Sequence, residues 1–198
     1  MSLNDTPRAN RLHIGIYGKR NAGKSSLINA LTGQPLAIVS DVPGTTPDPV
    51  SKAMEILPLG PCLVTDTAGL DDEGELGKLR VERTLAVVDK TDIAVVVVDG
   101  SAKDDLAAEK EWIDRLAEKK TPIIIAVNKL DVFAESNVPE MFLSGIKEVL
   151  GDYPVIAVSA AKGLGFGKLR QAIEEALPEE YTEDYLREKI LGELIGEG

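Results

Sequence analysis

The chain has 198 residues, 43% of them hydrophobic, so it can bury one substantial core with at most a terminal appendage. Its 33 acidic residues outnumber its 22 basic ones, and the net charge of -11 argues against a broad nucleic-acid-binding surface. No apolar run approaches the roughly 18 residues of a membrane helix, and the single cysteine excludes an internal disulfide, so we expect a cytoplasmic protein without a membrane partner. Residues 1–10 are expected to be a flexible leader.

The first predicted elements are a strand, a glycine-containing turn and a helix. Residues 12–17 form an apolar run that predicts a strand buried on both faces. Residues 18–25 then read GKRNAGKS, which fills every fixed position of the nucleotide phosphate loop. The glycines allow successive N–H groups to face one anion, and the start of the helix adds a partial positive charge. Lys24 is expected to reach the β- and γ-phosphates, and the Ser25 hydroxyl to ligate Mg²⁺.

The rest of the chain alternates predicted strands and helices. Residues 33–49 contain four prolines and no periodicity, which indicates a long functional loop. Strands are expected at residues 50–57, 62–65, 93–98, 123–127 and 155–158, and helices at residues 78–89, 104–119, 139–150 and 167–177. The turn between the first two of these strands makes the pair antiparallel. The pattern predicts an α/β fold with a mostly parallel six-stranded sheet, one antiparallel edge strand and helices on both faces.

Pro178 marks the end of the folded domain, which we expect to span residues 11–177. Residues 178–198 are acidic, yet their apolar residues recur at helical spacing. We expect an amphipathic helix or linker that leads toward further domains and needs a surface on this domain, on a partner or downstream. A solvated acidic tail is the alternative.

Further polar residues fall where predicted strands end or in the long loop. Asp66 ends a strand, so it can hold Mg²⁺ through a water molecule, and the backbone N–H of Gly69 can bind a γ-phosphate. Thr46 in the long loop offers a second hydroxyl to Mg²⁺. Loops held only by the γ-phosphate and the metal relax once that phosphate leaves, which makes a switch.

A second group of residues predicts selection of guanine. The Asp131 carboxylate can accept both N1–H and N2–H of guanine, and adenine has no such donor pair. Asn128 lies at the same edge of the sheet. Lys129 is expected to cover the base and brace the phosphate loop, while the Ala160 N–H can donate to guanine O6. The full predicted set of nucleotide-binding residues is Lys19, Arg20, Asn21, Ala22, Gly23, Lys24, Ser25, Ser26, Asp66, Gly69, Asn128, Lys129, Asp131, Ser159, Ala160 and Ala161.

In order and spacing, these motifs resemble those of the translation-factor-like GTPases over residues 11–177. Within them, the chain is similar to the branch of tRNA-modification and ribosome-assembly GTPases, through the strings NAGKSS, PGTT and DTAGL. The resemblance implies a Ras-like fold, GTP and GDP as ligands, Mg²⁺ as cofactor and GTP hydrolysis at a low intrinsic rate. Lys24, Thr46, Gly69 and Asn21 are then the residues expected to act in catalysis.

Leu70 stands where Ras-like proteins carry the glutamine that orients water, and leucine cannot do so. The resembling branch uses a K⁺ ion near the β- and γ-phosphates instead. Carried over by position, Asn21 ligates this ion, and the long loop supplies further oxygens from Ser40, Val42 and Thr45. A cation at the developing charge stabilises the transition state. The alternative is that Asn21 only shapes the loop.

A narrower resemblance covers residues 39–84, which look like the GTPase domain of the FeFe-hydrogenase maturation factor, the HydF family. It implies a switch in assembly of the hydrogenase active-site cluster, with the radical-SAM maturases and the apo-hydrogenase as partners. The 198 residues do not include the dimerisation and iron–sulfur domains of that family. Whether the protein forms a homodimer through such domains stays open. Cys62 alone cannot hold an iron–sulfur cluster, and none is expected in this fragment. The alternatives are a GTPase in tRNA modification or ribosome assembly, and a nucleotide-sensing interaction module with negligible turnover.

Overall fold

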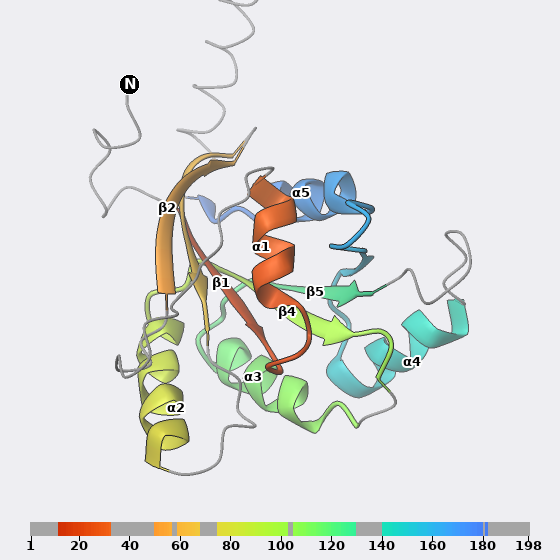
Figure 1. Ribbon diagram of the computed structural model, residues 1–198, viewed down its shortest axis with the longest axis horizontal. Helices are drawn as coiled ribbons and strands as arrows, with labels where there is room; N and C mark the ends of the chain where they lie inside the picture. The colour runs from red at the N-terminus through yellow and green to blue at the C-terminus, as the bar shows by residue number, and fades with distance from the viewer. Residues whose placement is uncertain are drawn as a thin grey trace, which may run out of the picture.

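The structure, a computed structural model, describes residues 12–32, 50–56, 59–67, 75–102, 105–129, 140–179 and 181. Its centre is a six-stranded sheet in the order β2-β3-β1-β4-β5-β6 (Figure 1). The strands are β1 (Leu12–Gly18), β2 (Val50–Ile56), β3 (Gly60–Asp66), β4 (Ile93–Asp99), β5 (Ile123–Asn128) and β6 (Val155–Ala157). The helices are α1 (Lys24–Thr32), α2 (Glu75–Val88), α3 (Ala107–Glu118), α4 (Glu140–Leu150) and α5 (Phe166–Glu175).

All strands except β2 run parallel, so their carboxyl ends share one edge of the sheet. β2 lies at the outer edge and pairs with β3 in the antiparallel sense, which places Val50 opposite Asp66. The predicted fold class is therefore confirmed, including the single antiparallel edge strand. β1 sits between β3 and β4, so the turn that follows it opens in the middle of this edge.

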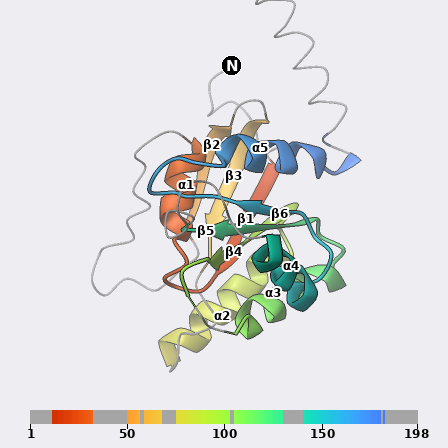
Figure 2. The same ribbon diagram turned by 90° about the vertical axis from the view of Figure 1, so that its right-hand side faces the viewer.

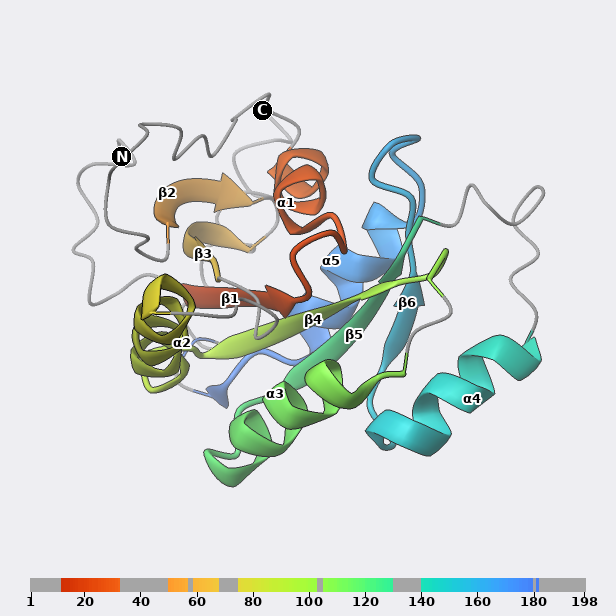
Figure 3. The same ribbon diagram turned by 60° about the horizontal axis from the view of Figure 1, so that its bottom comes forward.

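Two hydrophobic cores lie on opposite faces of the sheet. One joins alternate strand residues such as Ile14 and Val95 to α1 and α5. The other joins the intervening strand residues to α2, α3 and α4, and in it the rings of Tyr17 and Trp112 pack 5.2 Å apart between centroids. Figures 2 and 3 show this layering, with α1 and α5 on one side of the strands and α3 and α4 on the other. Helices thus cover both faces, as predicted.

The boundaries of several elements differ from the predicted ones. β3 begins at Gly60 rather than residue 62, because Gly60 adopts a φ of 81° that turns the chain and lets it pair with Ile56 at once. α2 begins at Glu75, before the predicted start at residue 78. Of the apolar residues that mark this helix in the sequence, Val88 is buried but Leu79 is 43% exposed.

Several predicted segments lie outside the described residues: the leader (residues 1–10), the long loop (33–49) and the tail beyond Tyr181. Tyr181 itself packs against the core beside α5, and its hydroxyl donates to Asp92 Oδ2 at 3.0 Å. No helix within the described ranges is both long enough and apolar enough to cross a lipid bilayer.

Candidate nucleotide site

The turn after β1 needs glycine at both of its ends. Gly18 has a φ of 146° and Gly23 a φ of 90°. A Cβ at Gly18 would lie 2.5 Å from the Val97 carbonyl oxygen, and one at Gly23 would lie 2.4 Å from Asn128 Nδ2. Any side chain would therefore push this loop away from β4 and β5. We call residues 18–25 the phosphate loop from here on.

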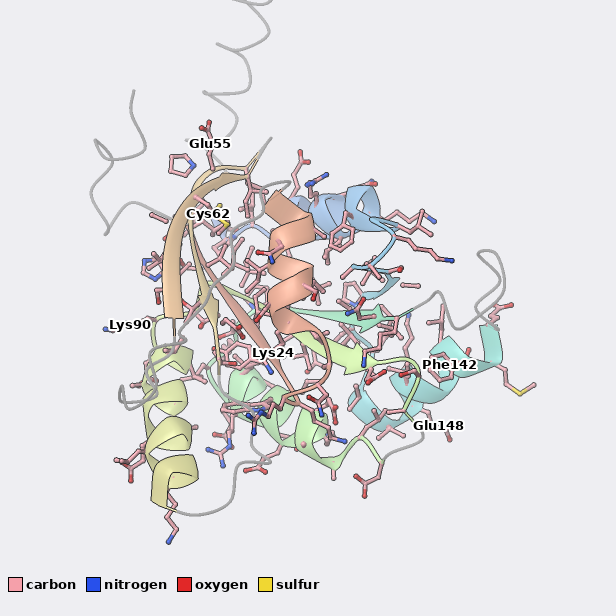
Figure 4. The ribbon with its side chains drawn as sticks, viewed as in Figure 1. Lys24, Glu55, Cys62, Lys90, Phe142 and Glu148 are labelled. Carbon is pink, nitrogen blue, oxygen red and sulfur yellow. The ribbon has the colours of Figure 1, made fainter. Side chains whose placement is uncertain are left out.

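Lys24, the first residue of α1, is the buried cation of the phosphate loop. Its side chain folds back under the loop, and Nζ donates to the carbonyl oxygens of Gly18 and Lys19, both at 2.8 Å. Figure 4 shows Lys24 where β1 gives way to α1. The first N–H groups of a helix have no partner within it, so these donors and the ammonium meet at one place. This arrangement suits a phosphate group.

Ser25 and Asp66 form the oxygen-rich part of the site. The Ser25 hydroxyl donates to Asp66 Oδ2 at 2.8 Å, and Asp66 is the last residue of β3. Burial raises the pKa of the Asp66 carboxyl, while the Ser25 hydrogen bond and the charge of Lys24 act in the opposite direction. Asp66 Oδ1 is buried without a hydrogen-bond partner among the described residues. A hydroxyl beside a carboxylate with an unused oxygen is the donor set that Mg²⁺ and its water shell prefer, so these residues fit the expected metal.

Asn128 and Lys129 hold the phosphate loop from the end of β5. Asn128 is buried, and its Nδ2 donates to the Ala22 carbonyl oxygen at 3.0 Å. The Lys129 ammonium donates to the Asn21 carbonyl oxygen at 2.9 Å. Two neighbouring residues thus bind two consecutive carbonyls, and Lys129 makes the bracing contact that was predicted for it.

The third loop at this edge follows β6. Ser159, two residues beyond β6, is fully buried and pairs through both backbone hydrogen bonds with Leu164. The Ala160 N–H, predicted to donate to guanine O6, donates to Asn128 Oδ1 at 3.0 Å. Ala161 lies exposed at the turn beyond it. The loop is therefore tied to the phosphate loop through Asn128.

The side chains of the other predicted residues in and beside the phosphate loop lie against α3 or are exposed. The Lys19 ammonium donates to the Asp105 carbonyl oxygen at 3.0 Å and lies 3.7 Å from Glu109 of α3. The Lys19 side chain is thus directed to α3, so only the backbone of this residue lies along the loop. The side chains of Arg20, Asn21 and Ser26 are exposed. Six predicted site residues lie outside the described part of the chain: Ser40, Val42, Thr45, Thr46, Gly69 and Asp131.

Two supporting residues were not predicted. Thr67 donates from its hydroxyl and from its backbone N–H to the Ile16 carbonyl oxygen, which fixes the strand end that carries Asp66. Asp99, at the end of β4, accepts a hydrogen bond from the Lys129 ammonium at 2.6 Å. Its position directly after a run of β-branched residues was the available signal, because the carboxyl ends of parallel strands meet at one edge.

Comparisons with known proteins indicate a family for this chain. The model of the family described as "50S ribosome-binding GTPase" matches residues 13–129, more than half of the chain. The chain belongs to this family of P-loop GTPases. A second model, the elongation factor Tu GTP-binding domain, matches residues 80–179.

Among curated relatives of this GTPase domain are tRNA modification GTPases named MnmE. The protein from Heliobacterium modesticaldum is 36% identical over 159 residues, which covers 80% of this chain and 32% of the relative. The one from Thermotoga petrophila is 38% identical over 162 residues, which covers 80% of this chain and 34% of the relative. The chain therefore spans about a third of the length of these relatives.

The solved structures similar to this GTPase domain include two of Era. Aquifex aeolicus Era bound to GDP·AlF4⁻ superposes with a TM-score of 0.72 at 25% identity, covering 84% of this chain and 57% of that one. Era in complex with MgGDPNP and a segment of 16S ribosomal RNA gives a TM-score of 0.71 at the same identity and coverage.

Proposed function

We propose that the chain binds GTP with Mg²⁺ and hydrolyses it slowly, as a switch. The observation that carries the proposal is the Ser25–Asp66 pair, which keeps one carboxylate oxygen without a partner among the described residues while the charge of the buried Lys24 ammonium acts on the carboxyl. Ser25 would hold Mg²⁺ directly and Asp66 would hold it through water, with Thr46 as the second hydroxyl. When bound, the metal neutralises charge on the β- and γ-phosphate oxygens.

The residues of the chain supply positioning and charge. Lys24 presents its ammonium to the phosphates, and the N–H groups at the start of α1 bind their oxygens. Gly69 binds the γ-phosphate through its backbone N–H and releases it after hydrolysis, which relaxes the surrounding loop. Because phosphoryl transfer depends mainly on positioning and electrostatic stabilisation, these groups account for slow turnover without a side chain that orients water.

Guanine is the base that this site is proposed to select, through Asp131 and the Asn128–Ala160 pair. Isothermal titration of the chain with GTP, GDP and ATP in Mg²⁺ tests this selectivity. We expect tight binding of both guanine nucleotides and at least 100-fold weaker binding of ATP, because a carboxylate left without its two guanine donors in the complex costs about 3 kcal/mol. Equal affinity for ATP and GTP would contradict the proposal.

We further propose that K⁺ stimulates hydrolysis, with Asn21, Ser40, Val42 and Thr45 supplying oxygens. The support is Leu70 at the water-orienting position and the placement of Asn21 on the outer side of the phosphate loop, where its side chain is exposed. Turnover is measured in K⁺ and in Na⁺ at equal ionic strength. We expect at least a tenfold stimulation by K⁺, which Asn21→Ala abolishes, while Arg20→Ala, its exposed neighbour, retains it. Equal rates in the two salts would exclude a role for K⁺.

For the pathway, we propose FeFe-hydrogenase maturation. The support is the similarity of residues 39–84 to that family and the net charge of -11, which suits protein partners better than RNA. Deletion of the gene in a host that makes the hydrogenase is expected to abolish hydrogenase activity while apo-enzyme still accumulates. The radical-SAM maturases are expected to co-purify with the full-length protein. Normal hydrogenase activity in the deletion strain would reject this pathway.

A second candidate is a GTPase of tRNA modification, which the names of the curated relatives favour. Analysis of modified tRNA nucleosides from the same deletion strain separates the two pathways, because only this candidate predicts a lost nucleoside. A nucleotide-sensing module with negligible turnover is distinguished by single-turnover hydrolysis with and without K⁺. Release of phosphate within one turnover excludes that module.

A further inference from the structure

Asp99 ends β4 at the nucleotide edge, outside the phosphate loop and the other predicted binding residues. Both of its carboxylate oxygens are engaged. Oδ2 accepts from the Lys129 ammonium at 2.6 Å, and Oδ1 accepts from the backbone N–H and the hydroxyl of Ser101 at 2.9 and 2.5 Å. The side chain is 17% exposed, so its orientation is fixed within a largely enclosed position.

The Asp99 carboxylate stays ionised at neutral pH. Burial acts to raise its pKa, but the hydrogen bonds from Lys129 and Ser101 outweigh burial and lower the pKa below its ordinary value. The Asp99 carboxylate therefore remains a full counter-charge for the Lys129 ammonium. Charge-assisted hydrogen bonds of this kind are about twice as strong as neutral ones.

Lys129 needs such an anchor because its backbone is in a conformation that side chains disfavour. Its φ of 66° lies in the left-handed region, where a residue other than glycine, asparagine or aspartate costs about 1 kcal/mol. Such a conformation persists when surrounding contacts hold it. Here these contacts are the two hydrogen bonds at the far end of the side chain, to Asp99 and to the Asn21 carbonyl.

The contact with Asn21 fixes the turn inside the phosphate loop. Lys129 and Asn128 bind the carbonyls of Asn21 and Ala22, two successive peptide groups. In a planar trans peptide the carbonyl and the following N–H point in opposite directions. Holding the Asn21 carbonyl toward Lys129 therefore turns the Ala22 N–H to the opposite side, where it donates to the Lys19 carbonyl oxygen at 3.1 Å and closes the turn of the phosphate loop.

We propose that Asp99 is a positioning residue for nucleotide binding: it holds the Lys129 ammonium on the Asn21 carbonyl and so keeps the phosphate loop in its binding conformation. Asp99 acts through Lys129 and does not touch the nucleotide. The inference rests on the guanine-nucleotide binding proposed above. It predicts that loss of the carboxylate weakens nucleotide binding more than it weakens the fold.

The test is the rate of GDP release from the full chain carrying Asp99→Asn, which keeps the shape of the side chain and one acceptor for Ser101. We expect release of a fluorescent GDP analogue to accelerate about tenfold, the effect of losing a hydrogen bond to a charged group. The KM for GTP should rise by about the same factor and kcat change less than about twofold, because a loop that binds substrate and transition state alike alters uniform binding. Asp89→Asn is the matched control, since Asp89 pairs with Lys119 at 2.9 Å at the other end of the sheet.

A double-mutant cycle with Lys129→Met identifies the route of the effect. If Asp99 acts through Lys129, adding Asp99→Asn to Lys129→Met changes GDP release by less than about twofold. An equal acceleration in both backgrounds, or release from Asp99→Asn no faster than from Asp89→Asn, overturns the assignment.

If Asp99→Asn does not fold, Ser101→Ala replaces it. This variant removes one hydrogen bond that orients the Asp99 carboxylate, so it should also accelerate GDP release. If the unaltered chain does not retain GDP, the proposed function itself is wrong. If the unaltered chain retains GDP and Asp99→Asn releases it no faster, only the role of Asp99 is wrong, so the two failures are distinguishable.

Discussion

Asp66 is the residue at which stability and function oppose each other most clearly. Its carboxylate is largely buried, one oxygen has no hydrogen-bond partner among the described residues, and burial raises its pKa. A buried charge without full compensation costs free energy of folding. The proposed metal site would explain this position, because Mg²⁺ stabilises the charge when it binds with nucleotide.

Asp66→Asn should therefore stabilise the nucleotide-free chain and abolish Mg²⁺-dependent hydrolysis. The amide keeps an oxygen for the Ser25 hydroxyl but carries no charge into the interior. We expect the melting temperature to rise by about 3 °C, the shift that about 1 kcal/mol produces in a domain of this size. Differential scanning calorimetry measures the shift, and phosphate release measures the loss of activity. A lower melting temperature would show that the buried charge is already compensated.

The raised pKa of Asp66 also predicts that the stability difference between the unaltered chain and Asp66→Asn depends on pH. The raised pKa of Asp66 means that, between its ordinary value near 3.8 and the raised value, the folded state binds more protons than the unfolded state. Its contribution to stability therefore falls as pH rises through this window. The stability advantage of Asp66→Asn should grow over the same window and then level off. Unfolding in urea across a pH series provides the measurement, and a constant difference would contradict it.

Site residues that belong to one contiguous motif could be predicted from the sequence, whereas a residue that joins the site through tertiary contacts could not. Gly18, Gly23 and Lys24 lie within one short motif, in which each residue type follows from the shape of a phosphate. The contact of Asp99 with Lys129 depends on the register of β4 against β5, which places Asp99 opposite Asn128. β4 and β5 are joined through α3, so packing of the whole domain sets the register between these two strands. A local sequence pattern does not reveal that register.

At the scale of elements, α1 connects the phosphate loop to the core. It begins at Lys24 and buries Leu27, Ile28 and Leu31 against the sheet. At its other end, Arg170 of α5 donates from Nη2 to the Leu31 carbonyl oxygen at 2.9 Å. A cation at this end satisfies a carbonyl that has no partner within the helix and complements the helix dipole.

Arg170→Met should loosen this end of α1 without altering the nucleotide site. We expect a loss of about 1 kcal/mol of stability, seen as a fall of about 3 °C in melting temperature, with GDP release changed less than about twofold. Lys168→Met, at an exposed position on the same helix, is the control for removal of a positive charge. Equal shifts in both variants would show that the contact with Leu31 contributes nothing.

The type and order of the elements followed from the sequence better than their ends. Apolar runs rich in β-branched residues, such as residues 93–98, predicted buried strands, and the alternation with helices predicted a parallel sheet. The early start of β3 depends on the conformation of Gly60, which its neighbours in space decide. The exposure of Leu79 likewise follows from how α2 lies on the sheet, which its own sequence does not specify.

For the whole molecule, the two ends of the sheet serve different purposes. The carboxyl ends carry the site, whereas the amino ends hold Asp92, whose Oδ2 accepts from the His13 N–H at 2.9 Å and from the Tyr181 hydroxyl. Tyr181 therefore fastens the chain beyond α5 to the end of β1 that lies away from the nucleotide. This separation was not predictable, because Tyr181 belongs to a segment whose sequence indicated only an amphipathic pattern.

Tyr181→Phe tests this fastening. Loss of the hydroxyl leaves one acceptor position of Asp92 unused, and we expect about 1 kcal/mol less stability with unchanged affinity for GDP. Tyr153→Phe removes a hydroxyl from a partly buried ring in the other core and is the matched control. Melting curves and GDP titration on both variants give the comparison. A change in GDP affinity would show that the two ends of the sheet are coupled.

The packing around Trp112 gives the chain a built-in optical probe. Trp112 is the only tryptophan in the sequence and is 1% exposed, so its emission comes from one enclosed environment. It lies one helical turn from Glu109, the residue that pairs with Lys19 of the phosphate loop, and its ring packs on Tyr17 at the end of β1. A movement of the loop that reaches α3 therefore changes the surroundings of a single fluorophore. We therefore expect nucleotide exchange in the unlabelled protein to change its intrinsic fluorescence, which would report exchange in real time.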